Sequence, residues 1–167
     1  SRPYGGYYRN LGRETFLVPF IWEDGWPIVN PGKGFVEEEM PFPKLSEHKW
    51  PALPQADSFD ADTLDDQWNF LRTPRGDFWS LSERSGFLRL KAKKETIMEE
   101  ENPSFVGRRQ QHIDFFAQTV MEFSPTQDNE TAGIVLLQNQ DFQFRMEVVL
   151  EKGERNIQLI RREAGVD

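Results

Sequence analysis

Cysteine is absent from this chain of 167 residues, and histidine occurs only twice. A chain without thiols forms neither disulfides nor thiolate metal sites. His48 and His112 lie far apart and have no ligand-type neighbours at a useful spacing, so we expect no metal site and no cofactor. No segment approaches the ~18 consecutive apolar residues that a membrane-spanning helix needs. The cell compartment is not readable from these features.

Basic residues are also scarce: 20 Lys and Arg face 28 Asp and Glu, which gives a net charge of −8 and a pI near 4.9. Such a chain is repelled by nucleic acid and by anionic membrane surfaces. The one basic cluster, Arg108 to His112, is too short to bind nucleic acid in so acidic a context. We therefore expect neither a nucleic acid nor a membrane as partner.

What the chain does contain is typical of an all-β protein. Aromatic residues make up 13%, and 12 glycines and 11 prolines separate short segments of alternating polarity. Residues 14–22 form the first expected strand, and because apolar residues occur on both of its faces we expect burial on both sides. Asp24-Gly25 predicts a tight hairpin turn, since glycine accepts the positive φ that such turns require. Residues 26–29 would be the returning strand.

Prolines at positions 31, 41, 43, 51 and 54 then exclude regular helix and predict an extended linker. A second β unit begins near Asp57. Its expected strands cover residues 57–60, 80–83, 87–91, 105–111, 117–123, 131–138, 142–150 and 156–162, with turns at Ser85-Gly86 and Lys152-Gly153. Regularly spaced strands separated by turn signals favour a sandwich or barrel. The run Ile134 to Leu137 predicts a buried strand.

The last expected strand carries Ile157, Leu159 and Ile160 and would leave an apolar edge without a partner. We therefore expect an incomplete sandwich, whose further strands come either from the remainder of a longer protein or from another chain.

Acidic and aromatic clusters are the first candidates for a site. Asp60, Asp62, Asp65 and Asp66 fit a turn with solvated carboxylates better than a calcium loop, because the glycine and the later glutamate of an EF-hand are missing. Phe78 and Trp79 follow a loop signature, Thr73 to Asp77, and could stack on a sugar at the surface. Trp68, Phe142 and Phe144 are expected in the core, since buried aromatics are far commoner than sugar platforms.

Three segments carry a family resemblance: Leu11-Gly12-Arg13-Glu14-Thr15, Trp22-Glu23-Asp24-Gly25-Trp26-Pro27, and Asn102-Pro103-Ser104-Phe105-Val106-Gly107-Arg108-Arg109-Gln110-Gln111-His112. They resemble the β-xylosidase/α-L-arabinofuranosidase group of glycoside hydrolase family 43. The resemblance implies a catalytic β-propeller followed by a concanavalin A-like β-sandwich. Residues 1–30 would be the terminal propeller strands, residues 31–56 the linker, and residues 57–167 the sandwich.

The resemblance also implies the division of chemical roles. The family's catalytic residues are three acids on earlier propeller blades, and no acid of this chain lies in a matching setting, so we expect no catalytic residue here. By residues alone a surface Arg–Glu ion pair is the better explanation of Arg13, because such pairs are common. The resemblance implies instead that Arg13 lines the pocket for the non-reducing-end sugar.

The expected parent protein is an inverting exo-glycosidase that releases xylose or arabinose from xylan-derived oligosaccharides. Its partners would be those oligosaccharides and the remaining propeller and sandwich segments, and this chain alone would be inactive. The alternative is a non-catalytic carbohydrate-binding or structural β-sandwich module, because a fold does not determine function. The sequence does not distinguish a xylosidase from an arabinofuranosidase.

Overall fold

The computed structural model describes residues 15–167, and within them it contains strands and connecting segments but no helix. The chain divides into two units, Ser1–Gln55 and Ala56–Asp167. Over the described range no helix long and apolar enough to cross a membrane occurs. The expected all-β class is confirmed. Arg13 precedes the described residues, so its expected place in a sugar pocket lies outside them.

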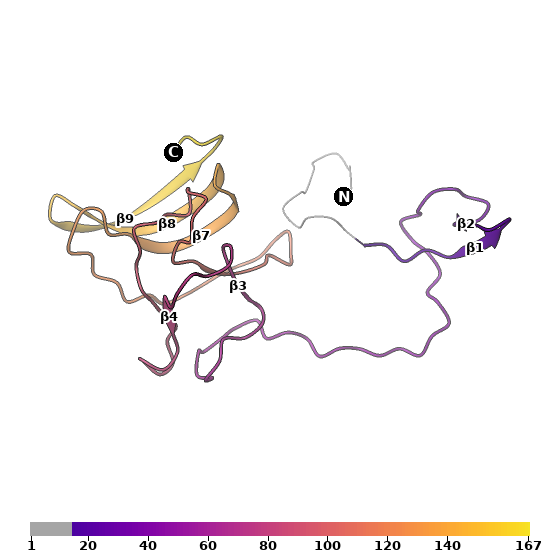
Figure 1. Cartoon of the computed structure of the whole chain (residues 1–167), viewed down its shortest axis with the longest axis horizontal. Coiled ribbons are helices and arrows are strands. Elements are labelled where there is room, and N and C mark those ends of the chain that lie inside the picture. The colour runs from indigo at the N-terminus through magenta and orange to yellow at the C-terminus, as the bar shows by residue number, and fades with distance from the viewer. Residues whose placement is uncertain (1–14) are drawn as a thin grey trace. The chain divides into compact units, whose positions relative to one another are not determined.

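The described part of the first unit, residues 15–55, contains one antiparallel hairpin of strands β1 (Phe20–Glu23) and β2 (Trp26–Val29) (Figure 1). Asp24 and Gly25 connect the strands with φ values of 51° and 82°, so the predicted turn is confirmed. The expected burial on both faces is wrong for this unit, because every residue of both strands is exposed. A two-stranded ribbon has no second layer to cover either face.

Residues 31–55 contain neither helix nor strand, in keeping with their prolines. Asn30 organises the start of this segment. Its side chain is buried, and its Nδ2 donates to the carbonyl oxygen of Phe35 at 2.7 Å. Its backbone N–H donates to the carbonyl oxygen of Pro19 at 2.8 Å, which ties the loop to the residue before β1.

Two short strand pairs lie in the first half of the second unit. Strand β3 (Trp68–Phe70) pairs with β6 (Val106–Arg108), and β4 (Trp79–Ser80) pairs with β5 (Arg89–Leu90), both antiparallel. Gly86 has φ of +75° in the predicted β4–β5 turn. The strands expected over residues 57–60 and 117–123 do not form. In the latter segment Val120 and Met121 are exposed, and alternation without a partner strand leaves the backbone hydrogen-bonding groups unpaired.

The longest strands form an antiparallel meander, β7 (Ala132–Asn139), β8 (Phe142–Glu151) and β9 (Glu154–Arg162), in the order β7-β8-β9 (Figure 1). These strands agree with the expected ranges, and Lys152 and Gly153 make the predicted β8–β9 turn with φ values of 53° and 81°. The register places Leu136 opposite Phe144 and Met146 opposite Leu159.

The polar face of this sheet is covered and the apolar face is exposed, whereas the sequence predicts the reverse. Phe142 and Phe144 lie on the solvent-facing side, 40% and 48% exposed, so their expected place in the core is wrong. Gln143 and Arg145 point the other way and are buried. The segment around Met98 covers this polar face, as the 3.5 Å contact between Arg145 Nη1 and Met98 Sδ shows. The predicted burial of Ile134 to Leu137 is likewise wrong for Leu136, which is exposed on the apolar face.

Candidate functional site

The start of the second unit is tied to β3 by one carboxylate. Asp57 accepts hydrogen bonds from the indole Nε1 of Trp68 at 2.7 Å and from the backbone N–H of Phe59 at 2.8 Å. The guanidinium of Arg108 lies 5.4 Å from the centroid of the half-buried Trp68 ring. Asp57 and Trp68 therefore serve the fold rather than a ligand.

The aspartate cluster that follows lies in the loop before β3. The Oδ1 atom of Asp65 accepts the backbone N–H of Gln67 at 2.8 Å, which is the Asx-turn geometry that favours aspartate in loops. Between residues 15 and 167 no group of three or more His, Cys, Asp or Glu side chains is arranged to hold a metal ion.

Phe78 and Trp79, the aromatic candidates from the sequence, both pack on Phe70. The Phe78 ring meets Phe70 edge-on with centroids 5.7 Å apart, and the Trp79 ring stacks on it at 6.2 Å. Phe78 is only 3% exposed, so its expected surface position is wrong. Its ring lies in the core beside Trp79, the first residue of β4, and apolar aromatic rings are commonly buried in this way. Trp79 is half-buried at the start of β4.

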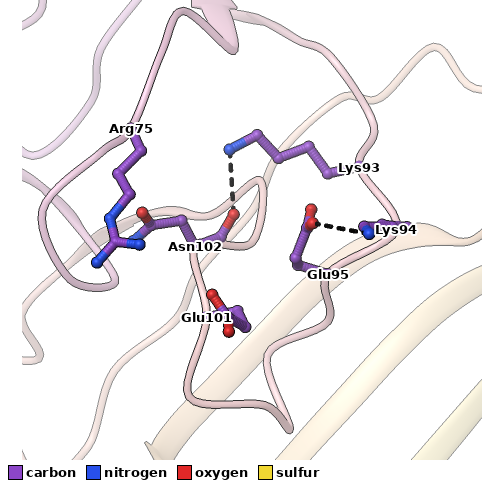
Figure 2. A pocket seen from close by; sticks show the side chains of 6 residues that line it. All are labelled: Arg75, Lys93, Lys94, Glu95, Glu101 and Asn102. Carbon is purple, nitrogen blue, oxygen red and sulfur yellow. Dashed lines mark hydrogen bonds and ion pairs between the residues drawn. The ribbon is translucent and has the colours of Figure 1, made fainter.

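The buried Phe78 ring supports a cation that reaches into a pocket. The ammonium Nζ of Lys93 lies 4.9 Å from the centroid of that ring and donates to the carbonyl oxygen of Asn102 at 3.1 Å. Figure 2 shows the pocket, a cavity of about 340 Å³. Its lining residues are Arg75, Lys93, Lys94, Glu95, Glu101 and Asn102.

The lining comes from two loops that hydrogen bonds hold together. Arg75 lies in the β3–β4 connection, and the other five residues lie in the β5–β6 connection. The side chain of Arg72 donates to the carbonyl oxygen of Glu101 at 2.7 Å, and the N–H of Lys91 donates to the carbonyl oxygen of Phe78 at 2.7 Å. The hydroxyl of Ser104 donates to the Lys91 carbonyl oxygen and closes the base of the second loop.

The pocket combines hydrogen-bond donors and acceptors. Three cationic side chains and two carboxylates line it, and Lys94 and Glu95 form a loose ion pair at 4.0 Å. The Oδ1 atom of Asn102 is inaccessible to solvent and accepts no hydrogen bond. An amide oxygen that is buried without a donor is costly, so this atom is a local defect in the hydrogen bonding of the loop.

A second charged cluster lies on the covered face of the long sheet. Arg145 Nη2 donates to Asp167 Oδ2 at 3.1 Å, and Arg162 Nη1 donates to Asp167 Oδ1 at 3.0 Å. These two hydrogen bonds hold the pKa of Asp167 below its ordinary value. Burial lowers the pKa of Arg145, but its bonds to Asp167 and Glu147 raise it more, so it stays charged. Every charge in this cluster is already paired, which suits a structural role.

Sequence reasoning did not single out the pocket. Arg75 lies within the loop signature Thr73 to Asp77, and Glu101 directly precedes the Asn102-Pro103 step. The pocket residues come from positions 75 and 93–102, and no periodic pattern relates two separate loops. The Asn102-Pro103 step marks a loop, but the contact between Lys93 and the Asn102 carbonyl is visible only in three dimensions.

The chain is similar to known proteins and to one protein-family model. Residues 56–167 match the family model described as the β-xylosidase C-terminal concanavalin A-like domain. A non-reducing end α-L-arabinofuranosidase, BoGH43B, from Bacteroides ovatus is 41% identical over 163 residues, which are 96% of this chain and 30% of that protein. A xylosidase/arabinosidase from Butyrivibrio fibrisolvens is 43% identical over 154 residues, 91% of this chain and 30% of that protein.

A solved structure agrees with these relatives. The xylan β-1,4-xylosidase from Bacillus halodurans C-125 superposes with a TM-score of 0.78 at 29% identity, covering 89% of this chain and 29% of that one. The chain thus spans about 30% of the length of the curated relatives that it matches.

Proposed function

Because this chain belongs to the family of β-xylosidase C-terminal concanavalin A-like domains of glycoside hydrolase family 43, we propose that it is part of an inverting exo-glycosidase. The parent enzyme hydrolyses terminal xylose or arabinose residues from xylan-derived oligosaccharides. The observation that carries this proposal is similarity along nearly the whole chain, at 41% and 43% identity, to an arabinofuranosidase and a xylosidase/arabinosidase.

The proposal assigns a role to each segment. Residues 1–30 are the terminal strands of a catalytic β-propeller, residues 31–56 are the linker, and residues 57–167 are a non-catalytic β-sandwich that packs on the propeller and helps to shape its active site. The hairpin supports this assignment, because Trp22 and Trp26 are 68% and 74% exposed on a ribbon that is marginally stable by itself.

The apolar face of the β7-β8-β9 sheet supports the same assignment. It carries the exposed side chains of Leu136, Phe144, Met146, Ile157 and Leu159. Contiguous apolar surface of this kind marks a contact with other protein. In the proposed parent enzyme this face packs against further polypeptide.

The chemistry follows from the proposed class. An inverting glycosidase needs a carboxylic acid that protonates the leaving oxygen and a carboxylate that activates water, ~6.5–9.5 Å apart. Both groups belong to propeller segments beyond this chain. Arg13 binds the non-reducing-end sugar through its guanidinium, whose planar set of donors suits vicinal hydroxyls.

Hydrolysis by the full-length protein tests the proposal. We expect release of 4-nitrophenol from 4-nitrophenyl β-D-xylopyranoside or α-L-arabinofuranoside, with inverted anomeric configuration in the first-formed sugar by proton NMR. Residues 1–167 alone are expected to be inactive. A full-length protein that hydrolyses neither substrate would contradict the proposal.

The alternative is a non-catalytic module, carbohydrate-binding or purely structural. The half-buried ring of Trp79 is its candidate sugar contact, because Phe78 is buried. Saturable binding of xylo-oligosaccharides without hydrolysis, lost in Trp79→Ala, would favour the binding module.

A further inference from the structure

We propose that residues 117–123 form a strand of the parent protein's sandwich, paired with a β-strand from the polypeptide outside residues 1–167. The inference rests on the proposed parent protein only in requiring further polypeptide, and it does not depend on hydrolysis. Three observations support it: a concentration of exposed apolar side chains, an alternation of polarity without a partner strand, and an ion pair that positions the segment.

Exposed apolar side chains are concentrated in and just before this segment. Five of them fall within nine residues of the chain: Ile113, Phe115, Phe116, Val120 and Met121. Phe116 and Val120 are 85% and 78% exposed. Apolar side chains gathered in this way mark a contact with other protein.

The backbone of residues 117–123 has no partner strand within the described chain. Over that range none of its N–H or C=O groups takes part in a backbone–backbone hydrogen bond. Strand β7, the next along the chain, pairs with β8 alone among the described strands. Water satisfies these exposed backbone groups, but the apolar side chains leave water only when other protein covers them.

The order of side chains suits a strand with one covered face. Two sets of residues alternate, Ala117, Thr119, Met121 and Phe123 with Gln118, Val120 and Glu122. Because alternate side chains of a strand point to opposite faces, Met121 and Phe123 would share one face and Gln118 and Glu122 the other. The first face would join the core of the sandwich, and the second, mostly polar face would meet solvent.

An ion pair holds the end of the segment in place. Arg84 Nη2 donates to Glu122 Oε1 at 2.7 Å, and Arg84 Nη1 donates to the other carboxylate oxygen. The guanidinium carbon of Arg84 lies 4.1 Å from the centroid of the Phe87 ring. Residue 122 is thereby fixed beside the β4–β5 connection, and a segment held at one end loses less conformational entropy when a strand pairs with it.

The same polypeptide is the source of the partner strand. The chain spans about 30% of the length of its curated relatives, so most of a protein of that length lies outside residues 1–167. The matched domain is concanavalin A-like, and a sandwich needs two sheets packed face to face. Within the described chain the second unit contains one three-stranded sheet and two short strand pairs. A strand of the same polypeptide has a high effective concentration, which favours it over a second copy.

Hydrogen exchange measured by mass spectrometry on the full-length protein tests the pairing. We expect the amides of residues 117–123 to exchange about a hundredfold more slowly than those of an unfolded chain of the same sequence, and equally slowly after dilution. Exchange at the rate of the unfolded chain would overturn the proposal. Protection that is lost on dilution would also overturn it, because it would identify a second copy as the partner.

Proline substitutions provide a second test with a matched control. In a strand the N–H groups of Thr119 and Val120 point in opposite directions, so at least one donates to a partner strand, and proline removes that donor. Thr119→Pro or Val120→Pro should therefore lower the urea midpoint of the full-length protein more than Ser46→Pro does. Ser46 is matched because its N–H also makes no backbone hydrogen bond within the described chain. Equal midpoints for all three variants would overturn the proposal.

The outcome is separable from that of the proposed function. Hydrolysis of the nitrophenyl glycosides is measured independently, and a protein inactive on them can still show slow exchange in residues 117–123.

Discussion

Arg145 donates from Nε to Oε1 of Glu147 at 2.5 Å, and both side chains are almost withdrawn from solvent, 9% and 13% exposed. The two residues lie on the covered face of β8 and are separated by one residue whose side chain faces solvent. Arg161 of β9 and Glu163, just after the strand, form a pair with the same spacing, but both of their side chains are well exposed. The protein thus contains two ion pairs of equal sequence spacing in opposite environments.

This contrast predicts unequal effects of removing the arginine. Arg145→Met should lower the free energy of unfolding by about 3 kcal/mol, because it leaves Glu147 buried without its partner. Arg161→Met should change it by less than about 1 kcal/mol, since an exposed pair contributes little. Urea denaturation of the two variants measures the difference. Equal losses in both would show that burial does not govern these pairs.

The hydrogen bonds to Asp167 predict a stability that falls in acid. Its pKa is lowered in the folded state by Arg145 and Arg162, so the unfolded state binds the proton more readily. The contribution is therefore complete above the unfolded pKa and is lost as the pH falls through the lowered folded pKa.

Urea midpoints measured from about pH 5 to about pH 2.5 check this dependence. Asp167→Asn should be less stable than wild type at neutral pH and should lose less stability on acidification. Glu122→Gln removes a carboxylate from an exposed pair with Arg84 and serves as the control. Parallel pH curves for wild type and Asp167→Asn would contradict the prediction.

Gly133 in β7 lies against the backbone of β8. A Cβ atom at this position would come within 2.0 Å of the Met146 carbonyl oxygen and 2.8 Å of the Glu147 Cα atom. Gly133→Ala should therefore lower the free energy of unfolding by about 2–3 kcal/mol, since paired strands cannot separate without losing hydrogen bonds.

Gly107→Ala in β6 is the matched control for Gly133→Ala. The three atoms nearest to its new Cβ all belong to the ring of Phe105, the first at 2.7 Å, and a side chain can rotate away. We expect a clearly smaller loss of stability in chemical denaturation. A larger loss at Gly107 than at Gly133 would refute the argument from backbone contact.

Substitution of Arg13 tests the proposed role of this chain in substrate binding. In the full-length protein, Arg13→Ala should lower kcat/KM on nitrophenyl glycosides by a factor equivalent to about 2–4 kcal/mol, as expected for the loss of charged hydrogen bonds to the sugar. Arg13→Lys keeps the charge but loses the paired donors and should recover only part of the activity. A kcat/KM near that of wild type in Arg13→Ala would refute the assignment.

Local features explain most of what the sequence predicted correctly. The β1–β2 and β8–β9 turns form at Asp24-Gly25 and Lys152-Gly153, where residues accept positive φ, and such preferences act over a few residues. The strand predicted over residues 117–123 does not form, because strand formation depends on more than local sequence. Its alternation was correct for a strand, but a strand also needs a neighbour, and no local signal supplies one.

The amino-acid sequence by itself determined the all-β class, the turns and the alternation of polarity along β8. It also carried the resemblance to glycoside hydrolase family 43, because motifs are contiguous in the chain. Only the tertiary structure decided which face of β8 is covered: Met98, 47 residues from Arg145, packs on the polar side. It also decided that Arg75 and Asn102 line one pocket. Burial and pocket formation depend on contacts between distant segments, and no period of a single strand encodes them.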